Sequence, residues 1–151
     1  MRRDTWERNN CMRLCLPALS VNEGVARAAV AAFCSQCDPT VTELADIKCA
    51  VSEAVTNCIV HAYREMRGDI YITVRLLGND GVRISVRDRG CGIEDVDRAM
   101  EPLFTTDAQG ERSGMGFTVM ESFMDKVKVT SKIGRGTSVT LYKALSSRGI
   151  T

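Results

Sequence analysis

The chain of 151 residues is 44% hydrophobic and 26% charged, values that are ordinary for one globular domain large enough to bury a core without disulfide or metal staples. Its formal net charge of +1 gives no global field that would recruit nucleic acid or an anionic membrane, so we expect neither as a direct partner. It shows no apolar run of about 18 residues and no secretory leader, and we expect a cytoplasmic protein.

Seven cysteines, an odd number spread mostly over predicted core positions, favour reduced thiols that pack as small hydrophobic side chains. Cys34 and Cys37 form a C-x-x-C sequence. Because a second pair of ligands is missing and the sequence lies in a predicted helix, a redox or metal role is the weaker interpretation.

The first elements of the chain are a strand and two helices. Alternating apolar residues over 12–16 predict a strand that ends at Pro17. The sequences SVNE at 20–23 and TVTE at 40–43 are capping boxes, each of which predicts the start of a helix. We expect the second helix to run to about residue 66 and to end before Gly68. On the first helix, the residues expected to face the core are Val25, Ala29, Val30, Phe33 and Cys37.

A hairpin, a long loop, a helix and a second hairpin follow. Alternation over 70–76 and 82–86 around the turn sequence GNDG predicts the first hairpin. Residues 90–116 are rich in glycine and show little periodicity beyond a short helix around 94–100, which is typical of a lid or binding loop. A helix that opens at Gly116 and strands over 127–131 and 137–142 complete the pattern.

This order of elements predicts an α+β fold. We expect a two-layer α/β sandwich in which a mixed, mostly antiparallel sheet is covered on one face by helices. We also expect a single domain over residues 11–146, a tail over 147–151, and a disordered start over 1–10, where no periodicity is visible.

The second predicted helix carries Glu53, Asn57 and His61 at four-residue steps, which places them on one face. The neighbours of Glu53 on that face are small or apolar, so we expect the face to line a pocket. A carboxylate in such surroundings needs a cation or a hydrogen-bond donor, and the amide oxygen of Asn57 suits Mg²⁺. On this helix alone, a buried acid capped by neighbouring hydroxyl groups fits equally well.

Asp88 continues the buried face of the strand over 82–86 and is followed by the sequence RGCG. Glycine there lets the chain turn tightly and lets another group approach the backbone. A buried carboxylate at this point needs a donor, and the exocyclic amine of a base would serve. The alternative is an Asx turn, in which the aspartate accepts hydrogen bonds from its own turn.

Gly114 and Gly116 precede the helix that opens at residue 116, where free backbone amides and the helix dipole favour an anion. Alone, this G-x-G is a weak signal. The chain contains no G-x-x-x-x-G-K-[ST] sequence, which excludes a P-loop protein, and it lacks the motif set of eukaryotic-type protein kinases.

Taken in order, Glu53-x3-Asn57, Asp88-x-Gly90-x-Gly92, Gly114-x-Gly116 and Gly136-Thr137 resemble the N, G1 and G2 boxes and the distal threonine of the GHKL (Bergerat-type) ATPase and kinase superfamily. Within it, the phrases SEAVTNCIVHAY, VRDRGCGIED, EPLFTT and ERSGMGFTVM are similar to the short, single-domain anti-sigma serine kinases of endospore-forming bacteria. The resemblance covers residues 14–145.

The resemblance implies a role for each matching residue. Glu53 would be the general base that activates the attacking hydroxyl, and Asn57 would be a Mg²⁺ ligand that bridges to the phosphates. Asp88 would read the adenine amino group with support from Thr137. Arg112 would place a cation near the terminal phosphate; a solvated arginine in the lid is the alternative. The other nucleotide-binding positions that the resemblance implies are Gly90, Gly92, Thr105, Thr106, Ser113, Gly114, Met115, Gly116 and Phe117.

The resemblance also implies partners. Proteins of this family are homodimers that bind ATP or ADP with Mg²⁺, hold a sporulation sigma factor inactive, and phosphorylate a serine of an anti-anti-sigma protein, so nucleotide and protein sites would be coupled. Arg27, on the first helix, is the candidate partner contact, although a surface arginine without a role fits equally well.

Two other classes of function compete with a kinase. One is a nucleotide-gated module that sequesters a sigma factor but transfers phosphate negligibly; the presence of both Glu53 and Asn57 favours the enzyme over it. The other is an ATPase domain of the gyrase, chaperone or mismatch-repair type, which we disfavour because 151 residues leave no room for a transducer domain.

Overall fold

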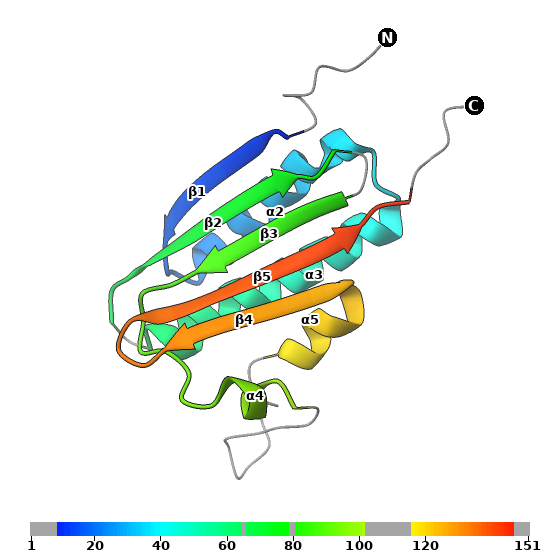
Figure 1. The fold of residues 1–151 in the computed structure, drawn as a ribbon. Helices are drawn as coiled ribbons and strands as arrows, with labels where there is room; N and C mark the ends of the chain where they lie inside the picture. The colour runs from blue at the N-terminus through cyan, green and yellow to red at the C-terminus, as the bar shows by residue number, and fades with distance from the viewer. Residues whose placement is uncertain (1–8, 65, 79–80, 102–115, 147–151) are drawn as a thin grey trace, which may run out of the picture.

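The computed structural model describes residues 9–64, 66–78, 81–101 and 116–146. It has two layers, a five-stranded sheet and a layer of helices packed on one of its faces (Figure 1). The strand order is β1-β2-β3-β5-β4, and every neighbouring pair is antiparallel. The predicted two-layer α+β fold is therefore confirmed, with a described sheet that is antiparallel throughout.

The predicted strands and both hairpins are confirmed. Leu76 pairs with Val82 across the first hairpin, and Lys132 pairs with Gly136 across the second. This register places the alternating apolar residues of every strand on the helix side, as one buried face requires. The strands are β1 (Cys11–Pro17), β2 (Asp69–Leu76), β3 (Gly81–Arg87), β4 (Lys126–Lys132) and β5 (Gly136–Ala144).

Four α-helices are described. The capping box predicted for the second of them is confirmed: Thr40 Oγ1 accepts the Glu43 N–H at 3.0 Å, and Glu43 Oε1 accepts the Thr40 N–H at 2.8 Å. Lys143 of β5 donates to Asp46 Oδ2 at 3.1 Å and to the carbonyl oxygen of Phe123 at 2.7 Å, which ties two helices to the sheet. The helices are α2 (Val21–Cys34), α3 (Val41–Asn57), α4 (Val96–Ala99) and α5 (Phe117–Phe123).

The capping box predicted at the start of α2 is wrong. Ser20 has helical backbone angles, φ −54° and ψ −36°, and makes no side-chain cap, because a capping residue needs an extended backbone to reach the third amide. The Glu23 carboxylate instead accepts hydrogen bonds from Arg27 and Ser52. Val25, expected to face the core, is 50% exposed. The buried face of α2 is made by Ala26, Val30, Ala31 and Cys34.

The second helix also departs from the prediction at its end. The α-helix stops at Asn57 rather than near residue 66, and a π-helical turn over Cys58–Ala62 follows, in which Tyr63 N–H donates to the Cys58 carbonyl at 3.2 Å. The Tyr63 hydroxyl then donates to the carbonyl of Asp69 at 2.6 Å and accepts the Arg89 N–H at 2.7 Å. Tertiary hydrogen bonds thus hold a turn of a kind that often marks functional sites.

The C-x-x-C sequence begins at Cys34, the last residue of α2, and continues through a 3₁₀ turn over Ser35–Cys37. Burial raises the pKa of the Cys34 thiol to about 12, so it stays protonated and packs in the core. Within the described ranges, no cluster of three or more histidine, cysteine, aspartate or glutamate side chains could hold a metal ion. None of the helices in these ranges is long and apolar enough to cross a membrane.

We expect the contact of α3 with the sheet to dominate stability. Ile47 is fully buried, so Ile47→Ala should lower the free energy of unfolding by about 2–5 kcal/mol. Val41, on the same helix, is 86% exposed, and Val41→Ala should change it by no more than about 0.5 kcal/mol. Urea unfolding of both variants tests this, and equal effects would contradict the assigned helix face.

Candidate functional site

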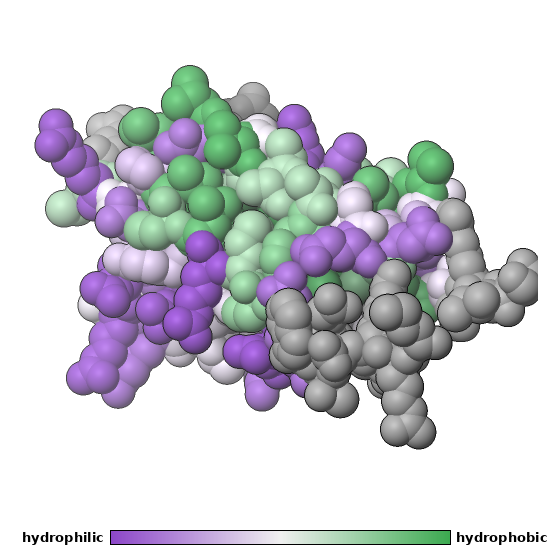
Figure 2. All heavy atoms as spheres, turned by 90° about the horizontal axis from the view of Figure 1, so that it is seen from above, coloured by the Kyte–Doolittle hydropathy of each residue, from purple (hydrophilic) through white to green (hydrophobic). Residues whose placement is uncertain are grey.

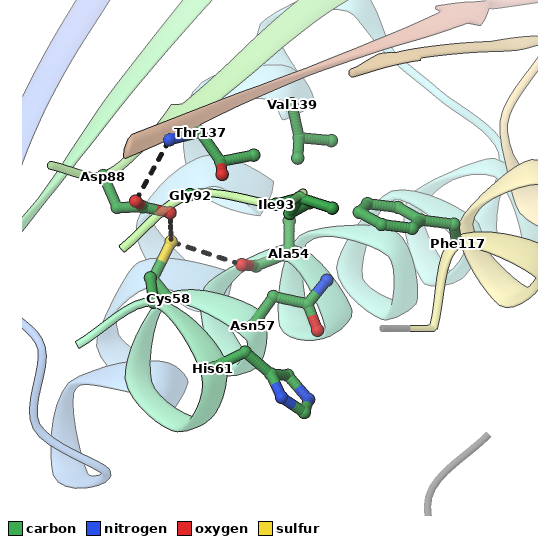
Figure 3. A pocket seen from close by; sticks show the side chains of 11 residues that line it. Ala54, Asn57, Cys58, His61, Asp88, Gly92, Ile93, Phe117, Thr137 and Val139 are labelled. Atoms are coloured by element: carbon green, nitrogen blue, oxygen red, sulfur yellow. Dashed lines mark hydrogen bonds between the residues drawn. The ribbon is translucent and has the colours of Figure 1, made fainter. Parts of the chain in front are cut away.

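A cavity of about 330 Å³, including its open mouth, lies on the helix side of the sheet at the end of β3 (Figure 3). Its walls combine apolar side chains with a few polar groups, which is the usual composition of a ligand site. The lining residues come from α3, the π-helical turn, the segment after β3, the start of α5 and β5, and they are Ala54, Asn57, Cys58, His61, Ala62, Asp88, Gly92, Ile93, Phe117, Thr137 and Val139.

Asp88 is the acidic residue of this cavity and is only 5% exposed. Its Oδ1 atom accepts the Gly90 N–H at 2.9 Å and the Thr137 N–H at 3.2 Å. The Cys58 thiol lies 3.6 Å from the other oxygen, Oδ2 (Figure 3). The Asx-type contact with Gly90 is therefore present, but it uses Oδ1 alone. Oδ2 keeps acceptor capacity for a donor from outside the protein.

The electrostatics of Asp88 reflect these contacts. Burial raises the pKa of its carboxyl, while the amides of Gly90 and Thr137 and the thiol of Cys58 lower it. Burial and the adjacent carboxylate raise the pKa of the Cys58 thiol, which therefore stays protonated. The thiol can also donate to the Ala54 carbonyl at 3.4 Å. Its proton thus has a second acceptor when another donor reaches Oδ2.

Thr137 supports Asp88 through its backbone rather than through its side chain. Its hydroxyl lies 2.7 Å from Ser131 Oγ, which also accepts the Ile93 N–H at 2.7 Å. Ser131 therefore joins β4, β5 and the segment after β3 behind the cavity. In the sequence the only signal for Ser131 is a serine at an inward position of a strand whose other inward residues are valines.

Glu53 lies at the point where the chain enters α5. Burial raises the pKa of its carboxyl. Gly116, the N-cap of α5, has φ +68°, and a Cβ there would collide with the Glu53 carboxylate. The positive φ therefore favours glycine at this position, and any larger residue would also displace the Glu53 carboxylate. Asn57, one turn after Glu53 on α3, lines the cavity with His61 (Figure 3).

The two glycines after Asp88 lie in different surroundings. A Cβ at Gly90 would collide with the backbone of Ala62, so Gly90 allows the π-helical turn to pack closely. Gly92 lines the cavity and has φ +79°. Cys91 between them donates its N–H to the Ala62 carbonyl at 3.0 Å. The pair therefore fixes the shape of the segment on which Asp88 depends.

Two arginines among the described residues, Arg27 and Arg89, do not line this cavity. Arg27, on the outer side of α2, forms an ion pair with Glu23 at 2.9 Å. Arg89, adjacent to Asp88, places its guanidinium 4.9 Å from the centre of the Tyr71 ring. Outside the described residues lie Thr105, Thr106, Arg112, Ser113, Gly114 and Met115.

The described residues fit a purine nucleotide with Mg²⁺. An exocyclic amine would find the Asp88 Oδ2 atom, and Ile93, Phe117 and Val139 offer apolar surface for a ring. Mg²⁺ with nucleotides is usually held by one or two protein oxygens together with phosphates and waters. The amide of Asn57 fits that arrangement and would not suffice for a site made of protein ligands alone.

The sequence matches the histidine kinase-like ATPase domain family over residues 16–143. It is 56% identical to the anti-sigma F factor of Caldanaerobacter subterraneus subsp. tengcongensis over 137 residues, 91% of this chain and 95% of that protein. It is 50% identical to the anti-sigma F factor of Priestia megaterium over 139 residues, 91% of this chain and 95% of that protein.

Two solved structures share the fold. The RsbU and RsbW domains of Rv1364c from Mycobacterium tuberculosis match 94% of this chain with a TM-score of 0.66 and 23% identity, and the chain spans 35% of that protein chain. The catalytic domain of the histidine kinase ThkA matches 90% of this chain, and 96% of its own, with a TM-score of 0.56 and 17% identity.

The raised pKa of Asp88 predicts that this residue lowers stability at neutral pH. At pH values between the pKa of Asp88 in the unfolded chain and its higher pKa in the native state, the native state binds more protons than the unfolded chain. The free energy of unfolding therefore falls as pH rises through this range, by at most about 1.4 kcal/mol per pH unit. Asp88→Asn should remove this loss, because its amide oxygen still accepts both backbone amides. The free energy of unfolding of the variant minus that of the wild type should therefore be larger at pH 7 than at about pH 4.

Urea unfolding over this pH range measures the effect. Asp97→Asn, at an exposed position of α4, is the matched control and should show no such trend. A stability difference between Asp88→Asn and wild type that is independent of pH would contradict a raised native pKa.

Proposed function

The chain belongs to the histidine kinase-like ATPase family and, within it, to the anti-sigma F factors, and we propose that it binds and inhibits a sporulation sigma factor and uses Mg-ATP to phosphorylate a serine of an anti-anti-sigma protein. The observation that carries the proposal is that Asn57 lines the Asp88 cavity while Glu53, one turn before it on α3, lies against Gly116 at the start of α5. A module that only binds nucleotide has no need for a base at that position.

In this proposal the cavity holds adenine. The amino group of the base donates to Asp88 Oδ2, and the ring contacts Ile93 and Phe117. Mg-ATP supplies the phosphoryl group that is transferred, and Asn57 holds the Mg²⁺ ion through its amide oxygen. Thr137 and Gly90 keep the Asp88 carboxylate in place through their amides, so the recognition of the base needs no rearrangement of that side chain.

Glu53 acts as the general base. It accepts the proton of the serine hydroxyl as the hydroxyl oxygen attacks the terminal phosphorus and ADP leaves. Partial burial raises the pKa of Glu53, which makes it a better proton acceptor than an exposed carboxylate. We assign to Arg112, Thr105, Thr106, Ser113, Gly114 and Met115 the contacts with the phosphates.

The outer side of α2 is our proposed contact surface for the sigma factor. Leu19, Val21 and Val25 are 55%, 78% and 50% exposed, and hydrophobic residues gather on this side of the molecule (Figure 2). Arg27 lies on the same helix and is held by Glu23 and by Ser52, the residue before Glu53. A cluster of exposed apolar residues beside a charged one is typical of a protein interface. We propose the edge strand β1 as part of a homodimer interface.

Kinase activity is tested with ATP labelled at the terminal phosphate and the anti-anti-sigma protein of the same genome. Glu53→Gln should lower the rate of serine phosphorylation by roughly 10²–10⁴-fold, because it removes the base. The control Glu121→Gln alters an exposed glutamate of α5 and should retain the rate. Labelling that persists in Glu53→Gln contradicts the role of the base. Labelling absent from every protein, despite ATP binding, supports a nucleotide-gated module instead.

Sigma binding is tested with two valines of similar exposure. Val21→Ser should weaken the affinity for the sigma factor by about tenfold, roughly 1.4 kcal/mol of lost apolar burial. Val41→Ser, on α3 at 86% exposure, should leave it unchanged. Titration of each variant with the purified sigma factor measures this. Equal affinity of the wild type and Val21→Ser would place the interface elsewhere.

A further inference from the structure

The sheet face that the helices leave uncovered is strongly basic. The strand register arranges its side chains in three rows that cross all five strands. The first row is Cys11, Arg75, Arg83, Tyr142 and Lys126. The second row is Arg13, Thr73, Ser85, Thr140 and Lys128. The third row is Cys15, Tyr71, Arg87, Ser138 and Thr130. We call these fifteen residues the open face.

The open face contains six cations and no acid. Asp69 lies beyond the third row, opposite Pro17. The ion pairs found among the described residues, Arg27 with Glu23 and Lys143 with Asp46, both involve the helix layer. No described carboxylate therefore neutralises the cations of the open face. Figure 2 shows hydrophilic residues gathered on the sheet side of the molecule, away from the hydrophobic surface of α2.

Two arrangements on the open face bring cations together. Arg75 lies directly opposite Arg83 on the neighbouring strand, and like charges in that position destabilise a sheet. Arg87 and Arg89 both place their guanidinium groups near Tyr71, 5.3 Å and 4.9 Å from the ring centre. The fold gains nothing from facing arginines, which suggests that an external anion balances them.

We propose that the open face binds single-stranded nucleic acid. Arginine and lysine would contact the phosphates, and the tyrosines Tyr71 and Tyr142 offer rings on which bases can stack. Serine and threonine hydroxyls lie between them and can contact phosphate or sugar. An uncovered sheet face with separated cations and aromatic rings suits an extended, flexible polyanion.

Two other occupants fit less well. An extended acidic polypeptide usually pairs with the backbone of an edge strand, whereas the backbone groups of β2, β3 and β5 are already paired inside the sheet. A second copy of this chain docked face to face would place six cations against six others. The net charge of +1 does not argue against an anionic ligand. Acidic residues of the helix layer cancel the charge of the open face in the total, but they do not lie on that face.

The test is fluorescence anisotropy with labelled 20-nucleotide oligo(dT) and oligo(U), over a series of salt concentrations. Arg75→Gln combined with Arg83→Gln should weaken binding roughly tenfold. It should also make the negative slope of log K against log salt shallower by about 1.4, since each phosphate contact on a single strand contributes about 0.7 to its magnitude. Lys48→Gln, at an exposed position of α3, is the control and should leave both values unchanged. The urea midpoint of each variant verifies that it folds.

Binding of either oligonucleotide with these effects supports the proposal, and the ratio of the two affinities tells whether the 2′-hydroxyl is read. Three outcomes would overturn the proposal. The first is no binding at low salt, and the second is an equal loss of affinity in Lys48→Gln. The third is that polyglutamate displaces the labelled oligonucleotide while neither unlabelled oligonucleotide does. If the protein binds no oligonucleotide and the double variant changes the dissociation constant of a homodimer, the open face serves self-association instead.

Discussion

The hydrogen bonding of Asp88 holds the rest of the site together. Backbone amides from the segment after β3 and from β5 fix one carboxylate oxygen, while the thiol at the end of α3 faces the other. Each contact comes from a different part of the chain, so the carboxylate can take this position only when the sheet register, the turn at Gly90 and the π-helical turn have all formed. Oδ2 then accepts no amide of the described backbone, and the proposed recognition of adenine depends on this oxygen.

This arrangement opposes stability in favour of function. Burial raises the pKa of both carboxyls at the site, Asp88 and Glu53, so that each is ionised at neutral pH at some cost to the folded state. The positive φ of Gly116 and the widened turn after Asn57 are further departures from regular structure at the same place. Regular packing elsewhere, above all the buried face of α3 against the sheet, offsets these local costs, as is common for binding sites.

The sequence predicted most of the fold because hydrophobic alternation and strong caps decide it: both hairpins and the capping box at Thr40 are found as expected. It failed where tertiary contacts compete with local signals. The Glu23 carboxylate bonds to α3 rather than capping its own helix, and the π-helical turn depends on Tyr63 bridging two distant segments. Nor did net charge reveal the basic open face, since a sum carries no information about where charges lie. The proposed roles of the site residues come from the resemblance in the motifs, because periodicity cannot provide them.

The most direct test of this account compares the affinities for ADP and for inosine diphosphate, in which a carbonyl oxygen replaces the amino group of adenine, in wild type and Asp88→Asn by isothermal titration calorimetry. If Oδ2 accepts a hydrogen bond from the amino group, the wild type should strongly prefer ADP, because a carbonyl would face a carboxylate without a proton between them, and the variant, whose amide can donate, should lose or reverse that preference. A wild type that binds the two nucleotides equally, or a variant that discriminates as well as the wild type, would contradict it.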